Sequence, residues 1–340
     1  MINKISYRNP RAIIITTIVC LAVVNMIAAY ILVLPTTTNM LTIDAKEIPA
    51  VFDDTYTNDS YNDIVPSSIE LNTDLPESTD KLIVYKVIPT DYDYANDIAL
   101  KLGFSGLYEL IVESDLKDGS VQAYGAVEGD STLTVSYNGY FSAQYKALPF
   151  DATNVSSLSK QECIDIAQEW LFTKGLYPES VTRIATGPML QVSTFNVETG
   201  YQSENTVLTY GISFFTEIGD YEASLPTVFV EIDTNGTIIG VDLHSQQLEE
   251  IGYVTIIDAE KALDILTGVL TNEVENSPKI SGCLINRGDF NDLVINEVSI
   301  QYTKSGNYIQ PTYYFCGTAY YDDGLGTVKE FKASIDAVVR

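Results

Sequence analysis

No motif typical of nucleophilic, metal-ion or acid–base catalysis is evident in the chain. Among its 340 residues is a single histidine, His244, so a zinc site with several imidazoles cannot form, and no Ser-His-Asp triad or Cys-His dyad is evident around it. The chain has 46 aspartates and glutamates, but nothing in the sequence pairs two of them as glycoside hydrolysis requires. The sequence therefore predicts a protein that is not an enzyme, with no catalytic residue, metal ligand or cofactor.

Two cysteines near the C-terminus raise the question of a disulfide. Cys283 and Cys316 flank a predicted strand region, and a bridge between them would contribute about 3–4 kcal/mol in an oxidising compartment. The alternative is that Cys316, which alternates with Tyr314 along a strand, is a buried thiol. The sequence leaves both possibilities open.

Tyrosine is abundant, and several tyrosines fall in two adjacent predicted strands. These residues are Tyr308, Tyr313, Tyr314, Tyr320 and Tyr321. Exposed tyrosine combines apolar area with a hydrogen-bonding hydroxyl, which suits a protein-binding face. The alternative is that these rings simply cover a sheet.

Three Asn-x-Ser/Thr sequons are possible glycosylation sites. They begin at Asn58, Asn154 and Asn235. Asn235 also lies in a predicted tight turn, which makes it the weakest acceptor of the three.

Residues 12–35 form an almost wholly apolar run, AIIITTIVCLAVVNMIAAYILVLP, which follows Lys4, Arg8 and Arg11. The run is long enough to span roughly 30 Å of hydrocarbon, and the basic residues before it favour a cytoplasmic N-terminus. We therefore expect a cytoplasmic tail at 1–11, a transmembrane anchor at 12–35 and an extracytoplasmic remainder. A cleavable signal peptide is the alternative, although its apolar core would be shorter.

The remainder of the chain is strongly acidic. Beyond residue 35 it has 16 basic and 46 acidic residues, a formal charge of −30. Such a surface repels phosphates, so nucleic acid is not an expected partner. Residues 36–80 combine acidic residues and prolines without periodicity, which predicts a disordered acidic stalk.

Hydrophobic periodicity predicts three helices, each at the start of a strand-rich stretch. Their apolar faces comprise Ala95, Ile98, Ala99 and Leu102; Cys163, Ile166, Ala167, Trp170 and Leu171; and Ala259, Ala262, Leu263 and Leu266. Gly103 is expected to end the first helix, Ser159 with Glu162 predicts a capping box for the second, and Asp258 should cap the third.

The strands follow these helices. Asn138-Gly139 and Asn235-Gly236 each separate two runs of alternating apolar residues, which predicts two-residue hairpins. Strands are also expected around 298–302, 313–321 and 331–335. The pattern predicts an α+β fold in which three tandem modules, 81–150, 151–250 and 251–340, each pack a helix on an antiparallel sheet. DIALKLGFSGLY (97–108) and DIAQEWLFTKGLY (165–177) suggest a duplicated unit, the alternative being chance similarity.

Three segments resemble PepSY-like domains in the order of their predicted elements and in short stretches of sequence. They are VEIDTNGTIIGVDL (230–243), DAEKALDIL (258–266) and VSIQYTKSGNYIQPTYYFCGTAYYDDG (298–324). The chain resembles in particular the YycH/YycI-type extracytoplasmic regulatory proteins. That resemblance implies a single membrane helix, a body of α+β modules, and a non-enzymatic role in which the protein contacts and modulates an envelope partner such as a sensor kinase or a peptidase.

Two other functional classes stay open at this stage. A structural component of the cell surface would also fit an acidic ectodomain that could carry glycans. A hydrolase that uses carboxylates not identifiable from the sequence is the further alternative.

Overall fold

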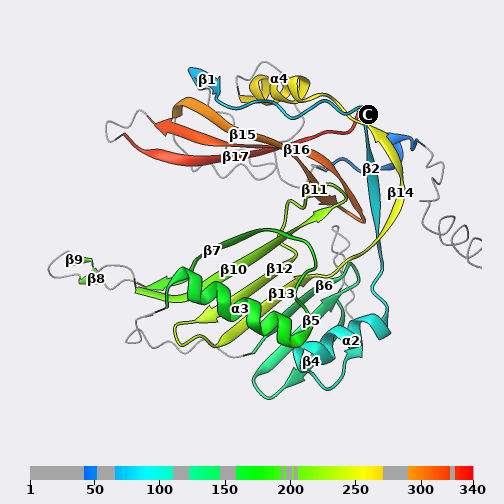
Figure 1. Cartoon of the computed structure of the whole chain (residues 1–340), viewed down its shortest axis with the longest axis vertical. Helices are drawn as coiled ribbons and strands as arrows, with labels where there is room; N and C mark the ends of the chain where they lie inside the picture. The colour runs from blue at the N-terminus through cyan, green and yellow to red at the C-terminus, as the bar shows by residue number, and fades with distance from the viewer. Residues whose placement is uncertain are drawn as a thin grey trace, which may run out of the picture. The chain divides into compact units, whose positions relative to one another are not determined.

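The computed structural model describes residues 42–51, 66–109, 122–145, 158–192, 195–196, 201–202, 206–270, 290–321 and 326–339 (Figure 1). These residues belong to one compact unit, Thr42–Arg340. The predicted tail at 1–11 and the predicted anchor at 12–35 lie outside the described residues. Within the described ranges, no helix is both long and apolar enough to cross a membrane.

Six strands form the first sheet, which we call sheet A. They are β1 (Ser68–Leu71), β2 (Lys81–Ile88), β14 (Gln247–Thr255), β15 (Phe290–Ser305), β16 (Tyr308–Tyr321) and β17 (Val328–Asp336). Their order is β1-β15-β16-β2-β14, and β17 also pairs with β16. β1 runs parallel to β15, with Ser68 opposite Asp292, while the other pairs are antiparallel. Residues far apart in the sequence therefore share one sheet.

Nine strands form the second sheet, sheet B. They are β3 (Tyr108–Glu109), β4 (Gln122–Glu128), β5 (Ser131–Ser136), β6 (Tyr140–Gln144), β7 (Val181–Val192), β10 (Thr206–Ile218), β11 (Tyr221–Glu222), β12 (Val228–Asp233) and β13 (Ile238–His244). Their order is β11-β10-β12-β13-β6-β5-β4-β3, with β7 paired to β10. A separate two-stranded ribbon joins β8 (Phe195–Asn196) and β9 (Tyr201–Gln202).

The three predicted helices and both predicted hairpins are confirmed, but the hairpin loops are longer than the predicted two residues. The Gly139 amide donates to the Ser136 carbonyl and the Gly236 amide to the Asp233 carbonyl, so each glycine directly follows the two central residues of its turn. α2 (Tyr92–Leu102) ends at Gly103, whose φ of 102° suits glycine. α3 (Lys160–Lys174) begins with the predicted capping box, and α4 (Ala259–Leu270) begins after Asp258, which accepts a hydrogen bond from the Lys261 amide at 2.7 Å. In the hairpin turns, Gly139 and Gly236 have φ values of 77° and 84°. A short 3₁₀ helix, η1, spans Ala45–Glu47.

Each sheet has a helix-covered face and its own apolar core. α2 and α3 lie on sheet B, and α4 lies on sheet A (Figure 1). The sheet B core contains Phe141, Val241 and Leu243 together with Leu102 and Leu171 from the two helices. Because strand side chains alternate between faces, the residues between these apolar positions project to the face of the sheet that carries no helix.

The predicted α+β architecture of three tandem modules is wrong. The fold is mostly β, with two large sheets: α2 and α3 share sheet B, so the first two predicted modules do not have separate sheets. β6 joins them by pairing with β13, with Phe141 opposite Leu243. β2, expected in the first module, pairs instead with β14 and β16 of sheet A. The reason is that the backbone hydrogen-bonding groups at a strand edge are the same whatever the sequence. A strand therefore pairs with the edge that lets its apolar face join a core.

The predicted disordered stalk is also wrong for its described part, residues 42–51 and 66–80. Ile48 is buried in the sheet A core, where Ile43, Ile69 and Leu75 also pack. The amide of Ile43 donates a 2.8 Å hydrogen bond to the carbonyl of Tyr253. Composition suggested disorder because it averages over the segment, whereas a few apolar residues at suitable positions suffice to anchor it to an existing sheet.

Candidate functional site

A cleft of about 560 Å³ lies where the end of sheet B meets strands β15 and β16 of sheet A. We call it the intersheet cleft. Its described lining comprises Thr134, Ser136, Asn138, Tyr140, Ile218, Ala223, Ser224, Leu225, Thr227, His244, Gln246, Tyr302, Lys304 and Ile309. A volume of this size is in the range of sites that hold a small molecule or a short peptide segment.

Tyr302 of β15 connects the two sheets at the base of the cleft. It forms a bridge with Ala223, and the amide of Ser224 donates a 2.9 Å hydrogen bond to its carbonyl. Its hydroxyl donates to the Ile83 carbonyl at 2.8 Å, and its ring contacts Tyr85 at a centroid distance of 5.4 Å. Burial raises the pKa of Tyr302, so the hydroxyl stays protonated as a donor. These contacts fix the wall that sheet A contributes.

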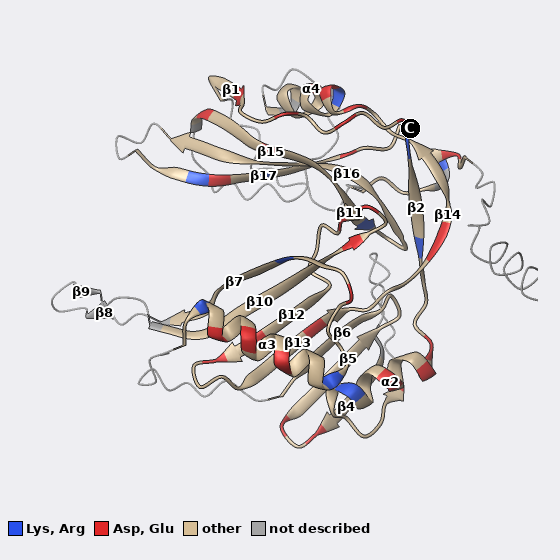
Figure 2. Cartoon of the chain, viewed as in Figure 1, with Lys and Arg blue, Asp and Glu red and all other residues tan. Residues whose placement is uncertain are grey.

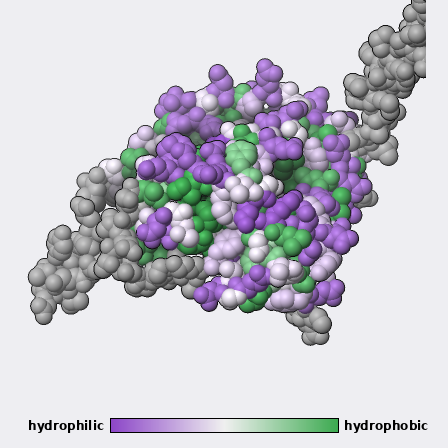
Figure 3. Space-filling view, turned by 60° about the horizontal axis from the view of Figure 1, so that its bottom comes forward, coloured by the Kyte–Doolittle hydropathy of each residue, from purple (hydrophilic) through white to green (hydrophobic). Residues whose placement is uncertain are grey.

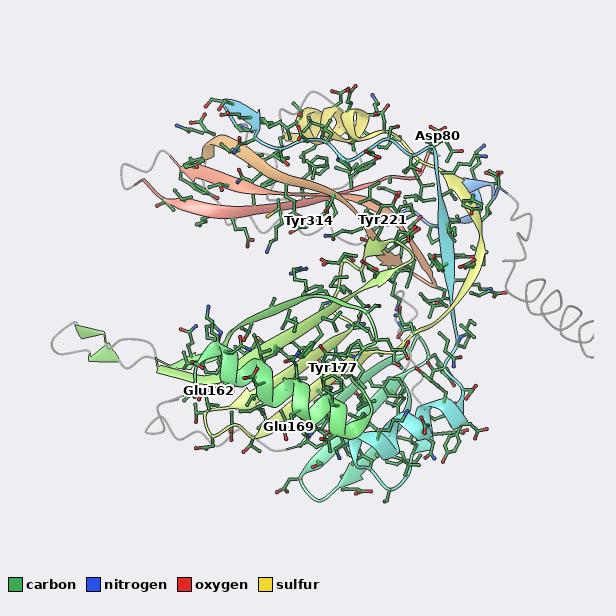
Figure 4. The ribbon with its side chains drawn as sticks, viewed as in Figure 1. Asp80, Glu162, Glu169, Tyr177, Tyr221 and Tyr314 are labelled. Carbon is green, nitrogen blue, oxygen red and sulfur yellow. The ribbon has the colours of Figure 1, made fainter. Side chains whose placement is uncertain are left out.

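Tyr221 of β11 completes this junction. Its ring lies 6.1 Å from that of Tyr302, and Figure 4 shows it beside the ends of the sheet A strands. Rings at this distance are typical of aromatic contacts that stabilise buried packing. The junction is therefore an aromatic contact supported by backbone hydrogen bonds.

His244 is the most distinctive residue of the sheet B wall. It lies at the end of β13, opposite Tyr140 of β6, and the two rings are 4.9 Å apart. Burial lowers the pKa of His244, and the positive charge of Lys304 lowers it further, while Asp242 acts in the opposite direction. The imidazole is therefore neutral at neutral pH and can both donate and accept a hydrogen bond.

Tyr140 and Asp242 form the polar layer next to His244. Burial raises the pKa of Tyr140, and the charge of Asp242 adds to this effect. The Oδ1 atom of Asp242 is buried and has no hydrogen-bond partner among the described residues. Three titratable side chains thus lie close together on the sheet B side of the cleft.

The chemistry that this lining offers is binding. It combines hydroxyl and amide groups, the His244 imidazole and the Lys304 ammonium with apolar side chains, and none of the described lining residues is a carboxylate. Figure 2 shows acidic residues on both sheets and on the helices. In the described part of the chain, no group of three or more His, Cys, Asp or Glu side chains is placed to hold a metal ion.

The five tyrosines singled out from the sequence do not form one exposed face. Tyr313 is only 1% exposed, and its hydroxyl donates to the Ile257 carbonyl at 2.9 Å. Tyr308 and Tyr321 pack against the sheet A core. Tyr314 projects from the face opposite α4 (Figure 4), and Tyr320, which shares its alternation along β16, is exposed. Only these last two could form part of a surface on that side of the sheet.

The other predicted site residues are placed as follows. Cys316 is half-buried on β16, but Cys283 lies outside the described residues, so the disulfide stays a prediction. Asn58 and Asn154 also lie outside them. Asn235 is exposed in the β12–β13 turn, where its amide donates to Asp233 at 2.9 Å.

Sequence reasoning missed the intersheet cleft. The lining comes from four segments spread over residues 134–309, which only the folded chain brings together. The only local signals were the positions of Asn138 and His244 at strand ends, where sites often occur. Those signals do not show which strand ends meet.

Comparisons with known proteins identify no family. No protein-family model and no curated protein matches this chain. Among solved structures, an uncharacterized protein from Eubacterium rectale is 12% identical to this chain, with a TM-score of 0.39. The alignment covers 80% of this chain and 89% of the Eubacterium rectale protein. The Bacillus megaterium YpeB C-terminal domain is 13% identical to this chain, with a TM-score of 0.31. The alignment covers 72% of this chain and 98% of that domain. Similarity this low carries no functional argument, so the PepSY-like resemblance stays a prediction.

Proposed function

We propose that this protein is a non-catalytic binding protein on the extracytoplasmic side of a membrane, and that it modulates another envelope protein by holding part of it in the intersheet cleft. The observation that carries this proposal is the contrast between the cleft and the rest of the chain. The chain has a net charge of −27, yet the described cleft lining has no carboxylate. Protein-binding surfaces are typically depleted of charge at their centre and enriched in aromatic residues.

Two further features support the proposal. Tyr140 provides aromatic surface, and the hydroxyl and amide groups around it can pair with the backbone of an extended segment. The apolar run at 12–35 is the sequence basis for the membrane location. This is also the role that the resemblance to YycH/YycI-type proteins implies.

Site-specific photocrosslinking in native membranes tests the proposal. Leu225 lines the cleft and is 53% exposed, whereas Leu100 on α2 is 54% exposed and is not among the cleft residues. A photoreactive amino acid at position 225 should crosslink one envelope protein that the same residue at position 100 does not. Ser224→Trp, which would obstruct the cleft, should reduce the yield from position 225 by about tenfold, the loss expected for roughly 1.4 kcal/mol.

Equal crosslinking from positions 225 and 100, or none from position 225, would contradict docking in the cleft. Crosslinking of position 225 to a second copy of the chain would instead support a structural surface component. Each photoreactive variant should keep the melting temperature of the unmodified chain, which controls for misfolding.

A further inference from the structure

Three tyrosines outside the intersheet cleft form a small aromatic group at the start of α2. Tyr92 is the first residue of α2, Tyr124 lies on β4, and Tyr137 lies in the β5–β6 turn. The ring of Tyr124 is 5.6 Å from that of Tyr92 at an angle of 78°, and 6.3 Å from that of Tyr137 at 62°. We call these three residues the tyrosine cluster.

One ring of the cluster is buried and the other two are exposed. Tyr124 is 8% exposed, whereas Tyr92 and Tyr137 are 43% and 47% exposed. A core aromatic with two solvent-facing rings steeply inclined to it offers ring faces to a ligand from more than one direction. Figure 3 shows one face of the molecule, on which apolar residues form several patches interspersed with hydrophilic ones.

Hydrogen bonds hold the segments around the two exposed tyrosines in place. The amide of Thr90 donates a 2.7 Å hydrogen bond to the carbonyl of Tyr137, which ties the turn to the start of α2. Asp91 caps α2 by accepting from the Tyr94 amide at 2.8 Å. The hydroxyl of Tyr92 donates to the Leu107 carbonyl at 3.4 Å. The segments that carry the two exposed rings are therefore positioned by the fold before any ligand arrives, which lowers the entropic cost of binding.

Two carboxylates lie near the cluster. Glu109 is paired in register with Tyr124 across β3 and β4, and Asp91 precedes Tyr92. Burial raises the pKa of Tyr124, and the neighbouring Tyr137, Glu109 and Asp91 raise it further. The faces of aromatic rings carry negative partial charge as well, so both the rings and the carboxylates favour a cation.

We infer that the tyrosine cluster binds a quaternary ammonium group, such as the trimethylammonium of choline. Such a group has no N–H to donate and is bound through ring faces, which recur in aromatic cages for these ligands. Tyr92 and Tyr137 present ring faces to solvent, and two carboxylates add negative charge beside the cluster. A quaternary ammonium can use both, because ring faces and nearby negative charge attract it without a hydrogen bond.

The test compares choline with its neutral isostere 3,3-dimethyl-1-butanol, using the full chain in a detergent without a quaternary ammonium headgroup. Saturation-transfer NMR and calorimetry should show that choline binds about fivefold more tightly or better, the ratio that corresponds to roughly 1 kcal/mol of cation–π attraction. Tyr137→Leu should abolish this preference and Tyr137→Phe should keep it.

The matched control is Tyr320, which is 42% exposed on sheet A, close to the 43% of Tyr92. Tyr92→Leu should lose the choline preference, and Tyr320→Leu should not. Equal affinity for the two ligands, no choline binding, or equal effects of the two variants would overturn the inference. Tighter binding of an N-acetyl-lysine amide than of choline would overturn the assignment to a quaternary group.

Discussion

At the scale of single residues, Gly317 lies at a position where the backbone of a neighbouring strand leaves no room for a side chain. It lies on β16 between β15 and β17, opposite Ile295 and Phe331. A Cβ atom there would overlap the carbonyl oxygen of Val294, which is backbone and cannot rotate away. The requirement is therefore for close approach of two strands, not for an unusual φ.

We expect Gly317→Ala to lower the free energy of unfolding by about 2 kcal/mol, because overpacking forces the strands apart. The matched control is Gly187→Ala on β7, where an added Cβ would meet no atom within 4 Å. That variant should stay within about 0.5 kcal/mol of the original chain. Urea denaturation measures both, and equal effects would show that β15 and β16 are not packed as closely as described.

At the scale of elements, the capping box of α3 links local sequence to pH. The side chain of Glu162 accepts a 2.7 Å hydrogen bond from the Ser159 amide, and the Ser159 hydroxyl accepts from the Glu162 amide at 3.2 Å. The hydrogen bonds from Ser159 hold the pKa of Glu162 below its ordinary value. A lowered carboxylate pKa means that the stabilisation is present above the ordinary pKa and is lost as the pH falls through the lowered one.

Glu162→Gln should therefore lower the melting temperature at pH 7 and make no difference in acid, below the lowered pKa, where Glu162 is itself protonated. Ser159→Ala should lower the free energy of unfolding by about 1 kcal/mol at pH 7, because it removes the N-cap acceptor. Glu169→Gln, on the same helix but outside its first turn, is the control (Figure 4). A Glu162→Gln effect that persists unchanged in acid would argue against an ionised cap.

At the scale of the whole molecule, the contact between the sheets can be measured through the chain's only histidine. His244 lies on sheet B and Lys304 on sheet A, so the effect of Lys304 on the pKa of His244 exists only if the sheets meet as described. NMR titration of an untagged chain should give a midpoint below 6.5. Lys304→Met should raise this midpoint, and Lys101→Met, whose lysine pairs with Asp97 on α2, should leave it unchanged.

The same shift makes stability depend on pH. In the unfolded chain His244 has its ordinary pKa, so as the pH falls below about 6.5 the unfolded state takes up a proton before the folded state does. The stability from the neutral imidazole is thus present above that pH and is lost down to the lowered pKa. His244→Gln should remove this loss in urea denaturation. A midpoint at or above 6.5, or no response to Lys304→Met, would contradict the described cleft.

The sequence by itself determined the local elements. Ser159 with Glu162, Asp258, Gly103 and the Asn138-Gly139 turn act through hydrogen bonds and φ preferences that span four or five residues, so they can be recognised without knowing the rest of the fold. The charge balance and the single histidine likewise follow from the sequence alone.

Only the tertiary structure decided how these elements combine. Lys81 lies opposite Thr255, and Phe141 opposite Leu243, pairings across more than a hundred residues that set the two sheets and hence the intersheet cleft. The physical reason is that backbone hydrogen bonds are the same for every strand edge, so partners are selected by competition among whole apolar faces. Local patterns show which face of a strand is apolar, but not which core it will help to form.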